Sequence, residues 1–451
     1  MTIGLDAIRE CLDGTFPAQL ATCAPDGTPN VTYVSEVHFV DGEHVALSFQ
    51  FFNKTHENIL ANPRAAALVM HPDTAARYRL RLEYLRTDTE GPLFESMKAK
   101  LAGIASHTGM SGVFRLLGSD VYRVIDIEHV PGDELPTRAA GRNLLAAMRV
   151  CSQRMSACTD LATLLEATLS NLESLCGIRH SMVLMLDAAA ERLYTVASRG
   201  YPQSGIGSEI PLGAGVIGVA ARERTPIRIT YMTSEYSYRR AIRESVRQGE
   251  LAGMLETEIP LPGLAEPCSQ LAVPILAGTR TLGVLYVESP EDRRFGYDDE
   301  DALVAVAAQL GTVIPLLQAA DEQQADAPQV DSGRPTVSGA LATIRHYAEN
   351  DSVFIGDDYL IKGVAGAIFW KLVRDYVHGS RTEFTNRELR LDPAIRLPDV
   401  SENLEARLIL LQRRLTERCS FLRLAKTGRG RFRLCVDRPV KLVEIDRGAA
   451  G

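Results

Sequence analysis

The chain has 451 residues, which exceeds what one hydrophobic core usually organises and predicts about three domains. Its composition, 45% hydrophobic and 24% charged, is that of a soluble globular protein, and its net charge of −8 argues against nucleic-acid binding over the whole surface. No apolar run of membrane-spanning length and no export signal is evident, so we expect a cytoplasmic protein without membrane contact.

Two polar stretches divide the chain. Pro, Gly and charged residues interrupt the pattern around 131–142, and a run with almost no apolar anchor follows residue 318. We therefore predict a multidomain α+β protein with domains at 1–133, 140–318 and 338–451, and a linker at 319–337. Eight scattered cysteines lack any CxxC spacing, which indicates buried thiols in a reducing compartment.

The first segment, 1–133, is rich in strand patterns. Its β-branched and aromatic runs are separated by Asp-Gly pairs at 26–27 and 41–42, which favour hairpin turns. A helical stretch at 55–62 and a second amphipathic helix lie among the later strands. Several antiparallel strands with one or two helices predict a small barrel.

The helical stretch begins with a Lys-Thr-x-x-Asn-Ile sequence followed by Asn-Pro. A lysine and a hydroxyl at a helix N-terminus can hold a phosphate, because free N–H groups and the helix dipole both favour an anion there. Together with LATCAPDGTPNV and VYRVIDIE, this sequence resembles the FMN-binding split barrel of the pyridoxamine-phosphate-oxidase-like superfamily. The resemblance implies that Ser48, Lys54, Thr55 and Asn58 contact the flavin phosphate and ribityl chain. Phe49, Phe51 and Phe52 depart from the polar residues expected nearby. The alternatives to FMN are haem, which we consider less favoured, F420, and a helix cap with no cofactor at all.

The middle segment, 140–318, has a different pattern. A long helix predicted at 143–176 leads into strands, and a closing helix follows residue 297. The sequences GAGVIG at 213–218, Ala-Val-Pro at 272–274 and Gly-Val-Leu at 283–285 resemble a GAF domain over essentially its full length. The resemblance implies an antiparallel sheet with flanking helices and a pocket for a small-molecule effector.

The wall of that pocket is predicted in the insertion at 231–266. Tyr236, Tyr238, Arg239 and Arg240 lie there and could meet an anionic ligand. A solvated amphipathic helix is the alternative, and the signature of cyclic-nucleotide-binding GAF domains is not visible. The identity of the GAF ligand is left open.

Both terminal helices of the middle segment carry apolar residues at a 4-3 spacing. Such stripes can pair two subunits through a helical bundle, so we favour a homodimer. Packing of one stripe on its own sheet is the alternative.

The last segment contains a strongly basic region. Between Arg407 and Arg433, nine basic residues accompany one acid, which gives a local charge of +8 and leaves −16 for the remainder. A helix is predicted from Asp358, a capping box opens a second helix at Thr385, and a third helix precedes two alternating runs joined at 427–430.

Three helices followed by a cationic hairpin resemble the winged helix at the C-terminus of response regulators. The resemblance implies that the third helix enters the DNA major groove and the hairpin holds the backbone. The predicted DNA-binding residues are Arg407, Arg413, Arg414, Arg418, Lys426, Arg429, Arg431 and Arg433. A winged helix used for protein contacts is the alternative.

These predictions favour a one-component transcription regulator that senses a small molecule or redox state. The main alternative is an FMN-dependent oxidoreductase whose other domains regulate it. Against the enzyme, no paired catalytic carboxylates and no Ser/His/Asp grouping stand out in the sequence. A signalling scaffold without DNA contact is a third hypothesis.

Overall fold

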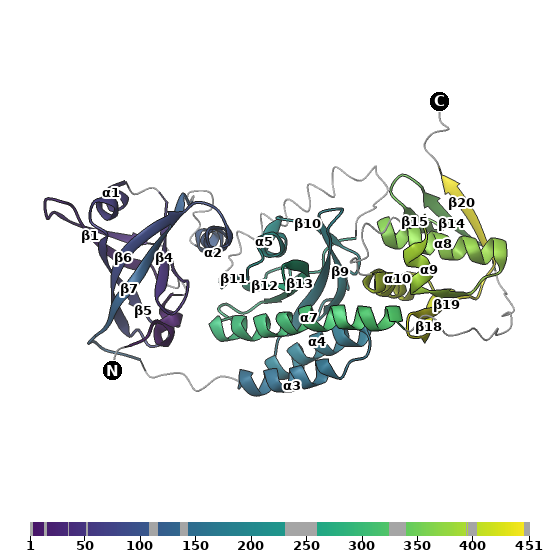
Figure 1. Cartoon of the computed structure of the whole chain (residues 1–451), viewed down its shortest axis with the longest axis horizontal. Helices are drawn as coiled ribbons and strands as arrows, with labels where there is room; N and C mark the ends of the chain where they lie inside the picture. The colour runs from purple at the N-terminus through teal and green to yellow at the C-terminus, as the bar shows by residue number, and fades with distance from the viewer. Residues whose placement is uncertain are drawn as a thin grey trace, which may run out of the picture.

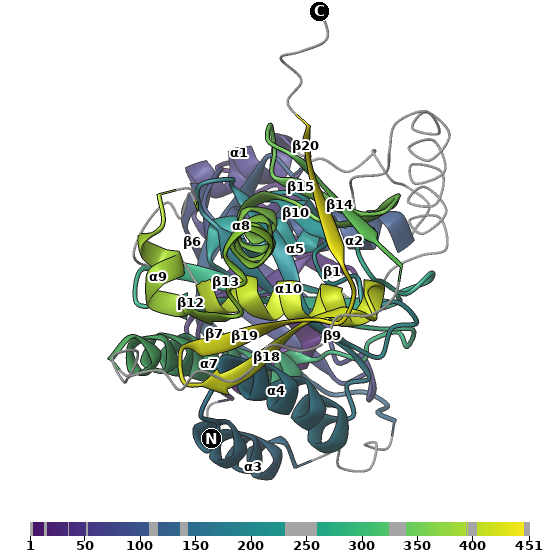
Figure 2. The ribbon, with the colours of Figure 1, turned by 90° about the vertical axis from the view of Figure 1, so that its right-hand side faces the viewer.

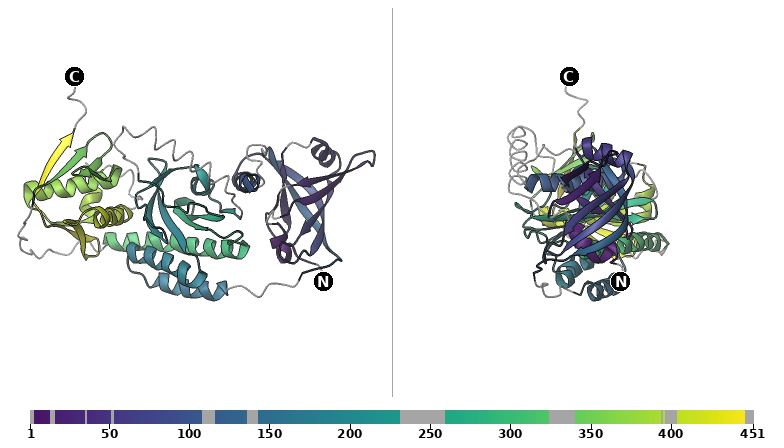
Figure 3. Two further views of the ribbon diagram at one scale, coloured as in Figure 1. Left: turned by 180° about the vertical axis from the view of Figure 1, so that it is seen from behind. Right: turned by 90° about the vertical axis from the view of Figure 1, so that its left-hand side faces the viewer.

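The computed structural model describes residues 3–12, 16–34, 36–50, 53–107, 116–135, 143–230, 259–323, 340–393, 395 and 404–445. Three domains follow one another along the long axis in chain order (Figure 1), and the same row is seen from behind in Figure 3. The first two domains each contain one of the described sheets, and the C-terminal domain contains two.

The N-terminal domain is a curled antiparallel sheet in the order β2-β1-β5-β6-β7-β4-β3. The predicted hairpin at Asp26 is confirmed, because Gly27 adopts a φ of 87° and the Thr28 N–H donates to Asp26 Oδ1 at 2.9 Å. Its elements are η1 (Leu5–Leu12), β1 (Ala18–Cys23), β2 (Pro29–Val34), β3 (Val37–Phe39), β4 (His44–Phe49), α1 (Asn53–Ala61), β5 (Arg64–Met70), β6 (Arg77–Asp88), α2 (Pro92–His107) and β7 (Gly118–Val130).

The middle domain is a six-stranded antiparallel sheet in the order β10-β9-β8-β13-β12-β11. Its elements are α3 (Leu144–Ser156), α4 (Leu161–Cys176), β8 (His180–Asp187), β9 (Arg192–Arg199), β10 (Glu209–Pro211), α5 (Gly215–Glu223), β11 (Ile227–Ile229), β12 (Ser269–Ala277), β13 (Arg280–Ser289) and α7 (Tyr297–Gln323). Alternate strand residues enter two separate apolar clusters, Val183 on one face and Met182 on the other. Accordingly α3, α4 and α7 lie on one face of the sheet and α5 on the other.

One helix predicted at 143–176 is wrong: the structure has two helices, α3 and α4. The Asp160 side chain accepts from the Thr163 N–H at 2.9 Å and begins α4 in an extended conformation. A cap of this kind satisfies a free N–H of a new helix, so the local polar residues end one helix and start another.

The C-terminal domain combines two sheets with three helices. A four-stranded sheet has the order β16-β15-β14-β20, and a three-stranded sheet has the order β17-β19-β18. Its elements are β14 (Ala342–Tyr347), β15 (Ser352–Ile355), β16 (Asp358–Ile361), α8 (Gly363–Gly379), β17 (Glu383–Thr385), α9 (Asn386–Leu391), α10 (Leu404–Arg418), β18 (Leu422–Gly428), β19 (Arg431–Val436) and β20 (Val440–Ile445). The predicted capping box is confirmed, because Thr385 Oγ1 accepts from the Glu388 N–H at 3.2 Å.

The predicted helix start at Asp358 is wrong. Asp358 begins β16, which pairs antiparallel with β15 through a turn at Gly356 (φ 63°), and α8 begins only at Gly363. A glycine in the left-handed region permits the tight turn, and pairing with β15 gives these residues hydrogen-bond partners that a helix would otherwise supply.

The apolar stripes predicted for subunit pairing lie inside one domain. Cys151 and Met155 of α3, and Leu303, Val306 and Leu310 of α7, are buried in the same core cluster. Gln309 of α7 also donates to the Ser152 carbonyl of α3 at 3.0 Å. Helix α7 packs on β12 of its own sheet, as the alternative interpretation held for one stripe, and α3 packs on α7. The homodimer stays a prediction.

Among the described helices, α7 is long and apolar enough to cross a membrane by length and composition, over Tyr297–Ala320. The expectation that no such run exists is therefore corrected. However, 44% of its most apolar 18-residue stretch is buried inside the protein, and α7 packs on β12 and α3.

The predicted linker at 319–337 falls partly on α7, which continues to Gln323, and otherwise lies outside the described residues. The C-terminal domain nevertheless contacts the middle domain. Helix α10 lies against β9 and α4. Figure 2 shows the C-terminal domain end-on, in front of the middle domain. One apolar cluster runs without interruption from the middle domain into the C-terminal domain.

Candidate functional site

Three of the four predicted cofactor residues, Lys54, Thr55 and Asn58, lie in the first two turns of α1. Thr55 and Asn58 are buried, whereas Lys54 is exposed. Asn58 Nδ2 donates to Thr22 Oγ1 at 3.0 Å, and Asn30 Nδ2 donates to Thr55 Oγ1 at 2.9 Å. Asn58 thus links α1 to the sheet, and the Thr55 hydroxyl accepts a hydrogen bond and donates to no acceptor among the described residues.

Ser48 lies on β4, beside this helix. Its hydroxyl accepts from Gln50 Nε2 at 3.4 Å, and the neighbouring Phe49 ring stacks on His56 of α1 with centroids 4.2 Å apart. The end of β4 and the first turn of α1 are therefore held together by this stack. The phenylalanine that departs from the family pattern has a packing role.

A carboxylate that sequence reasoning missed lies on the strand next to Ser48. Asp120 of β7 accepts from Thr87 Oγ1 at 2.6 Å, and its Oδ2 is 3.6 Å from His56 Nδ1. Burial raises the pKa of the Asp120 carboxyl. Ser119, paired in register with Ser48, is fully buried, and its hydroxyl has no hydrogen-bond partner among the described residues. Because side chains alternate along β7, Ser119 lies on the face that carries Ser48, whereas Asp120 lies on the opposite face, toward His56.

The glycines of the GAF-like motif at 213–218 allow a tight connection between β10 and α5. Gly213 adopts a φ of 82°, and a Cβ on Gly218 would lie 2.5 Å from the Pro211 carbonyl oxygen. Only glycine allows helix α5 to begin so close to the end of β10. The predicted ligand residues Tyr236, Tyr238, Arg239 and Arg240 lie outside the described residues.

A polar cavity of about 220 Å³ lies between the N-terminal and middle domains. His38 and Lys100 line it from one side, and Arg228 and Glu300 line it from the other. Arg228 Nε donates to Glu300 Oε2 at 2.6 Å, and Lys100 Nζ is 3.2 Å from His38 Nδ1. Glu36, 3.5 Å from His38, is fully buried, and neither carboxylate oxygen has a hydrogen-bond partner among the described residues.

The basic residues predicted to bind DNA do not form one free surface. Arg418 and Lys426 are exposed, but Arg407 and Arg414 are buried. Arg414 donates to the Leu360 carbonyl of its own domain at 3.0 Å. Contacts to the middle domain are made by Arg407, Arg413, Lys426 and Arg429. In this conformation those four side chains meet protein, and their contact with DNA stays a prediction.

The remaining cations lie on or beside the hairpin. Arg433 pairs with Glu383 of β17, and Arg423 pairs with Asp437 at 2.9 Å. The hairpin itself is confirmed, because β18 pairs antiparallel with β19 and the buried residues alternate with arginines along β19.

Residues 5–118 match the pyridoxamine 5'-phosphate oxidase family, and residues 158–314 match the GAF domain family. The chain carries a GAF domain. Its N-terminal domain is pyridoxamine-phosphate-oxidase-like, and neither match reaches the domain that begins at residue 340. The two domain types together suggest a sensory or regulatory protein, and both are typically soluble.

Solved structures resemble parts of the chain. The GAF domain from Acinetobacter phosphoenolpyruvate-protein phosphotransferase is 22% identical, over 40% of this chain and 97% of its own, with a TM-score of 0.31. Free methionine-R-sulfoxide reductase from Neisseria meningitidis is 17% identical over 41% and 98%, with a TM-score of 0.31. An FMN-binding protein from Syntrophomonas wolfei is 17% identical over 28% and 86%, with a TM-score of 0.25. No curated protein matches the chain.

Proposed function

We propose that this chain is a cytoplasmic one-component transcription regulator whose C-terminal domain binds DNA as a winged helix. The support is the order of elements in that domain: α9 and α10 precede a hairpin, β18–β19, that carries Arg431 and Arg433. Helices before a cationic hairpin are the arrangement that places one helix in the major groove and the hairpin on the backbone. The GAF domain takes a small-molecule effector, and two chains associate as a dimer.

DNA binding is tested on two cations whose side chains reach the surface. Arg418 at the end of α10 is exposed, and Arg431 on β19 is half-buried. If each contacts a phosphate, Arg418→Ala and Arg431→Ala each lower the slope of log affinity against log salt by about 1. Fluorescence anisotropy with a 30-base-pair duplex over a KCl series measures the slope.

Arg79→Ala, an exposed arginine on the N-terminal sheet, is the matched control and leaves the slope unchanged. If the salt slope of DNA affinity is the same for all three variants and the wild type, neither Arg418 nor Arg431 contacts DNA. Arg414→Ala is unsuitable for this purpose, because it would leave the Leu360 carbonyl without its buried donor.

For the N-terminal domain we propose FMN as the cofactor, with Lys54, Thr55 and Ser48 at its phosphate end. The match to the pyridoxamine 5'-phosphate oxidase family supports this proposal, as do the exposed lysine and the helix N-terminus beside buried hydroxyls. FMN would supply a redox-active, light-absorbing group. The residues named would bind and orient it.

Lys54→Ala is expected to weaken FMN binding by roughly 10- to 100-fold, because a charge-assisted hydrogen bond to phosphate contributes about 1.5–3 kcal/mol. The quenching of FMN fluorescence on titration with protein measures the dissociation constant. Lys98→Ala on α2, which removes an exposed lysine paired with Glu95, is the control. Wild-type protein that gives no quenching and no shift of the flavin spectrum contradicts flavin binding altogether.

A second candidate function is an FMN-dependent oxidoreductase, which the same family match favours. It requires that the purified protein is yellow and oxidises NAD(P)H or another reductant. An absorbance spectrum followed by a turnover assay separates the two functions. A flavin that is bound but not turned over supports the sensor.

A further inference from the structure

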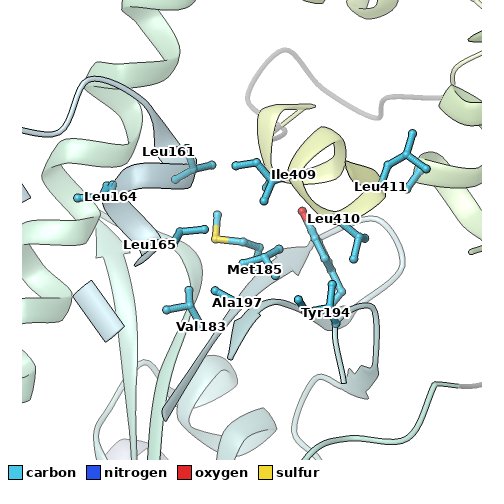
Figure 4. Close-up of a cluster of buried hydrophobic side chains, with 14 of the residues drawn as sticks. Leu161, Leu164, Leu165, Val183, Met185, Tyr194, Ala197, Ile409, Leu410 and Leu411 are labelled. Carbon is cyan, nitrogen blue, oxygen red and sulfur yellow. The ribbon is translucent and has the colours of Figure 1, made fainter. Parts of the chain in front are cut away.

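The face of α10 turned toward the GAF domain is apolar in its middle. Ile409 and Leu410 are buried, although neither belongs to the leucine stripe that repeats along α10 at helical spacing, Leu404, Leu408, Leu411 and Leu415. Figure 4 shows both side chains directed at the GAF domain, with Ile409 beside Leu161 and Leu410 beside Tyr194. Leu410 approaches so closely that a Cβ on Gly207 would lie 3.4 Å from its Cδ1. The partners on the GAF side of this cluster include Leu161, Leu165, Met185, Tyr194 and Ala197.

Charged contacts surround this apolar centre. Arg407 forms an ion pair with Asp187 of β8, and its guanidinium lies 3.7 Å from the centroid of the Tyr194 ring. Only 6% of the Arg407 side chain is exposed. Arg413 Nη1 donates to the Val196 carbonyl of β9 at 2.7 Å. Two arginines of the helix predicted to enter the groove are thus neutralised or hydrogen-bonded by the GAF domain.

The hairpin is held in the same way. Lys426 Nζ lies 3.4 Å from Asp160 Oδ2, and Arg429 Nη2 donates to the Thr159 carbonyl at 3.3 Å. Thr159 and Asp160 form the start of α4, beside the strands that hold α10. Helix and hairpin, the two parts that would contact DNA, therefore meet one continuous GAF surface.

We propose that this surface, composed of Thr159, Asp160, Asp187, Tyr194 and Val196 and here called the latch surface, competes with DNA for α10 and the hairpin. The proposal rests on the proposed DNA-binding function. A guanidinium that pairs with Asp187 cannot at the same time pair with a phosphate, and the apolar contact of Leu410 blocks the helix face sterically. Only molecules in which α10 and the hairpin have left the latch surface can bind DNA. The apparent DNA affinity is therefore the intrinsic affinity multiplied by the fraction of such molecules. A change in the GAF domain that moves β9 or α4 releases the output domain.

The test changes only the GAF side, so that no predicted DNA contact is altered. Asp187→Asn and Asp160→Asn are combined in the full chain. Both substitutions remove charge but keep local structure, because Asp187 Oδ1 accepts from the Ala190 N–H and Asp160 caps α4, and asparagine serves both roles. We expect binding to a 30-base-pair duplex to tighten at least tenfold. We also expect faster hydrogen exchange of the amides of α10.

The matched control is the combination of Asp126→Asn and Asp88→Asn, two acids paired with arginines on the N-terminal sheet. It changes the net charge equally, so it reports any general gain in attraction to DNA. If the latch variant and the control bind DNA alike and α10 stays protected, the latch is overturned while the DNA-binding function stands. If α10 exchanges faster but no protein binds the duplex, the DNA-binding function fails, and the competition fails with it.

Discussion

Glu36→Gln is expected to raise the stability of the protein at pH 8 by several degrees in melting temperature and to leave it nearly unchanged at pH 4.5. Glu36 is completely buried between the N-terminal and GAF domains, and burial raises the pKa of its carboxyl to about 8 despite the opposing charges of Lys100 and Arg228. His38 does not supply a compensating charge, because burial holds its own pKa well below the usual range. The folded protein therefore keeps a proton that the unfolded chain releases.

The direction of the effect follows from this proton. The folded-state pKa is above the unfolded value near 4.5, so the contribution of Glu36 to stability is fully present below pH 4.5 and is lost as the pH rises through 8. The loss is of the order of 3–5 kcal/mol for a fully buried group. Glutamine has a similar shape and no proton to release, so its difference from the wild type grows between pH 5 and pH 8.

Thermal unfolding followed by circular dichroism at pH 4.5, 6 and 8 measures this difference. Glu128→Gln, an exposed glutamate paired with Arg79, is the control and shows no such trend. A difference between Glu36→Gln and the wild type that does not grow with pH would show that Glu36 is ionised in the folded protein.

Arg228→Met is expected to destabilise the protein by about 3 kcal/mol, the lower end of the range for breaking a buried ion pair, because Glu300 loses its partner but keeps some contact with solvent. The Arg228 side chain is fully buried, pairs with Glu300 at 2.6 Å, and lies 4.2 Å from the centroid of the Tyr297 ring. Methionine fills similar volume but cannot pair with Glu300. Denaturant unfolding measures the loss.

Arg192→Met is the control for this substitution. Arg192 lies on an exposed part of the GAF domain, 3.5 Å from Glu209, and a surface pair of this kind contributes less than about 1 kcal/mol. The charge of Arg228 lowers the pKa of Glu36, so removing Arg228 raises that pKa further. The loss of stability that accompanies ionisation of Glu36 then extends to higher pH. Equal unfolding free energies for both methionine variants would contradict the structural role of Arg228.

Local patterns predicted much of the fold. The Asp-Gly hairpin at Asp26, the capping box at Thr385 and the alternation along β19 each depend on neighbours within a few residues, and all are confirmed. Two of the three family resemblances, to the pyridoxamine-phosphate-oxidase-like and GAF families, are supported by family matches, and the winged helix stays a prediction. By contrast, the sheet of β14, β15, β16 and β20 was missed, because β20 pairs with a strand nearly one hundred residues earlier in the chain.

The sequence by itself determined that a basic helix and hairpin follow a GAF domain, because charge and periodicity are properties of the chain. The sequence could not predict which of these arginines face solvent and which face another domain. Arg407 has the same spacing as a groove-facing residue, yet the tertiary structure buries it against Asp187 and Tyr194. Ile409 and Leu410, outside the leucine stripe, gave the only local signal of a second buried face. Only the packing of two domains decided which cations meet protein, since burial against a distant segment removes a charge from solvent regardless of its position in the helical pattern.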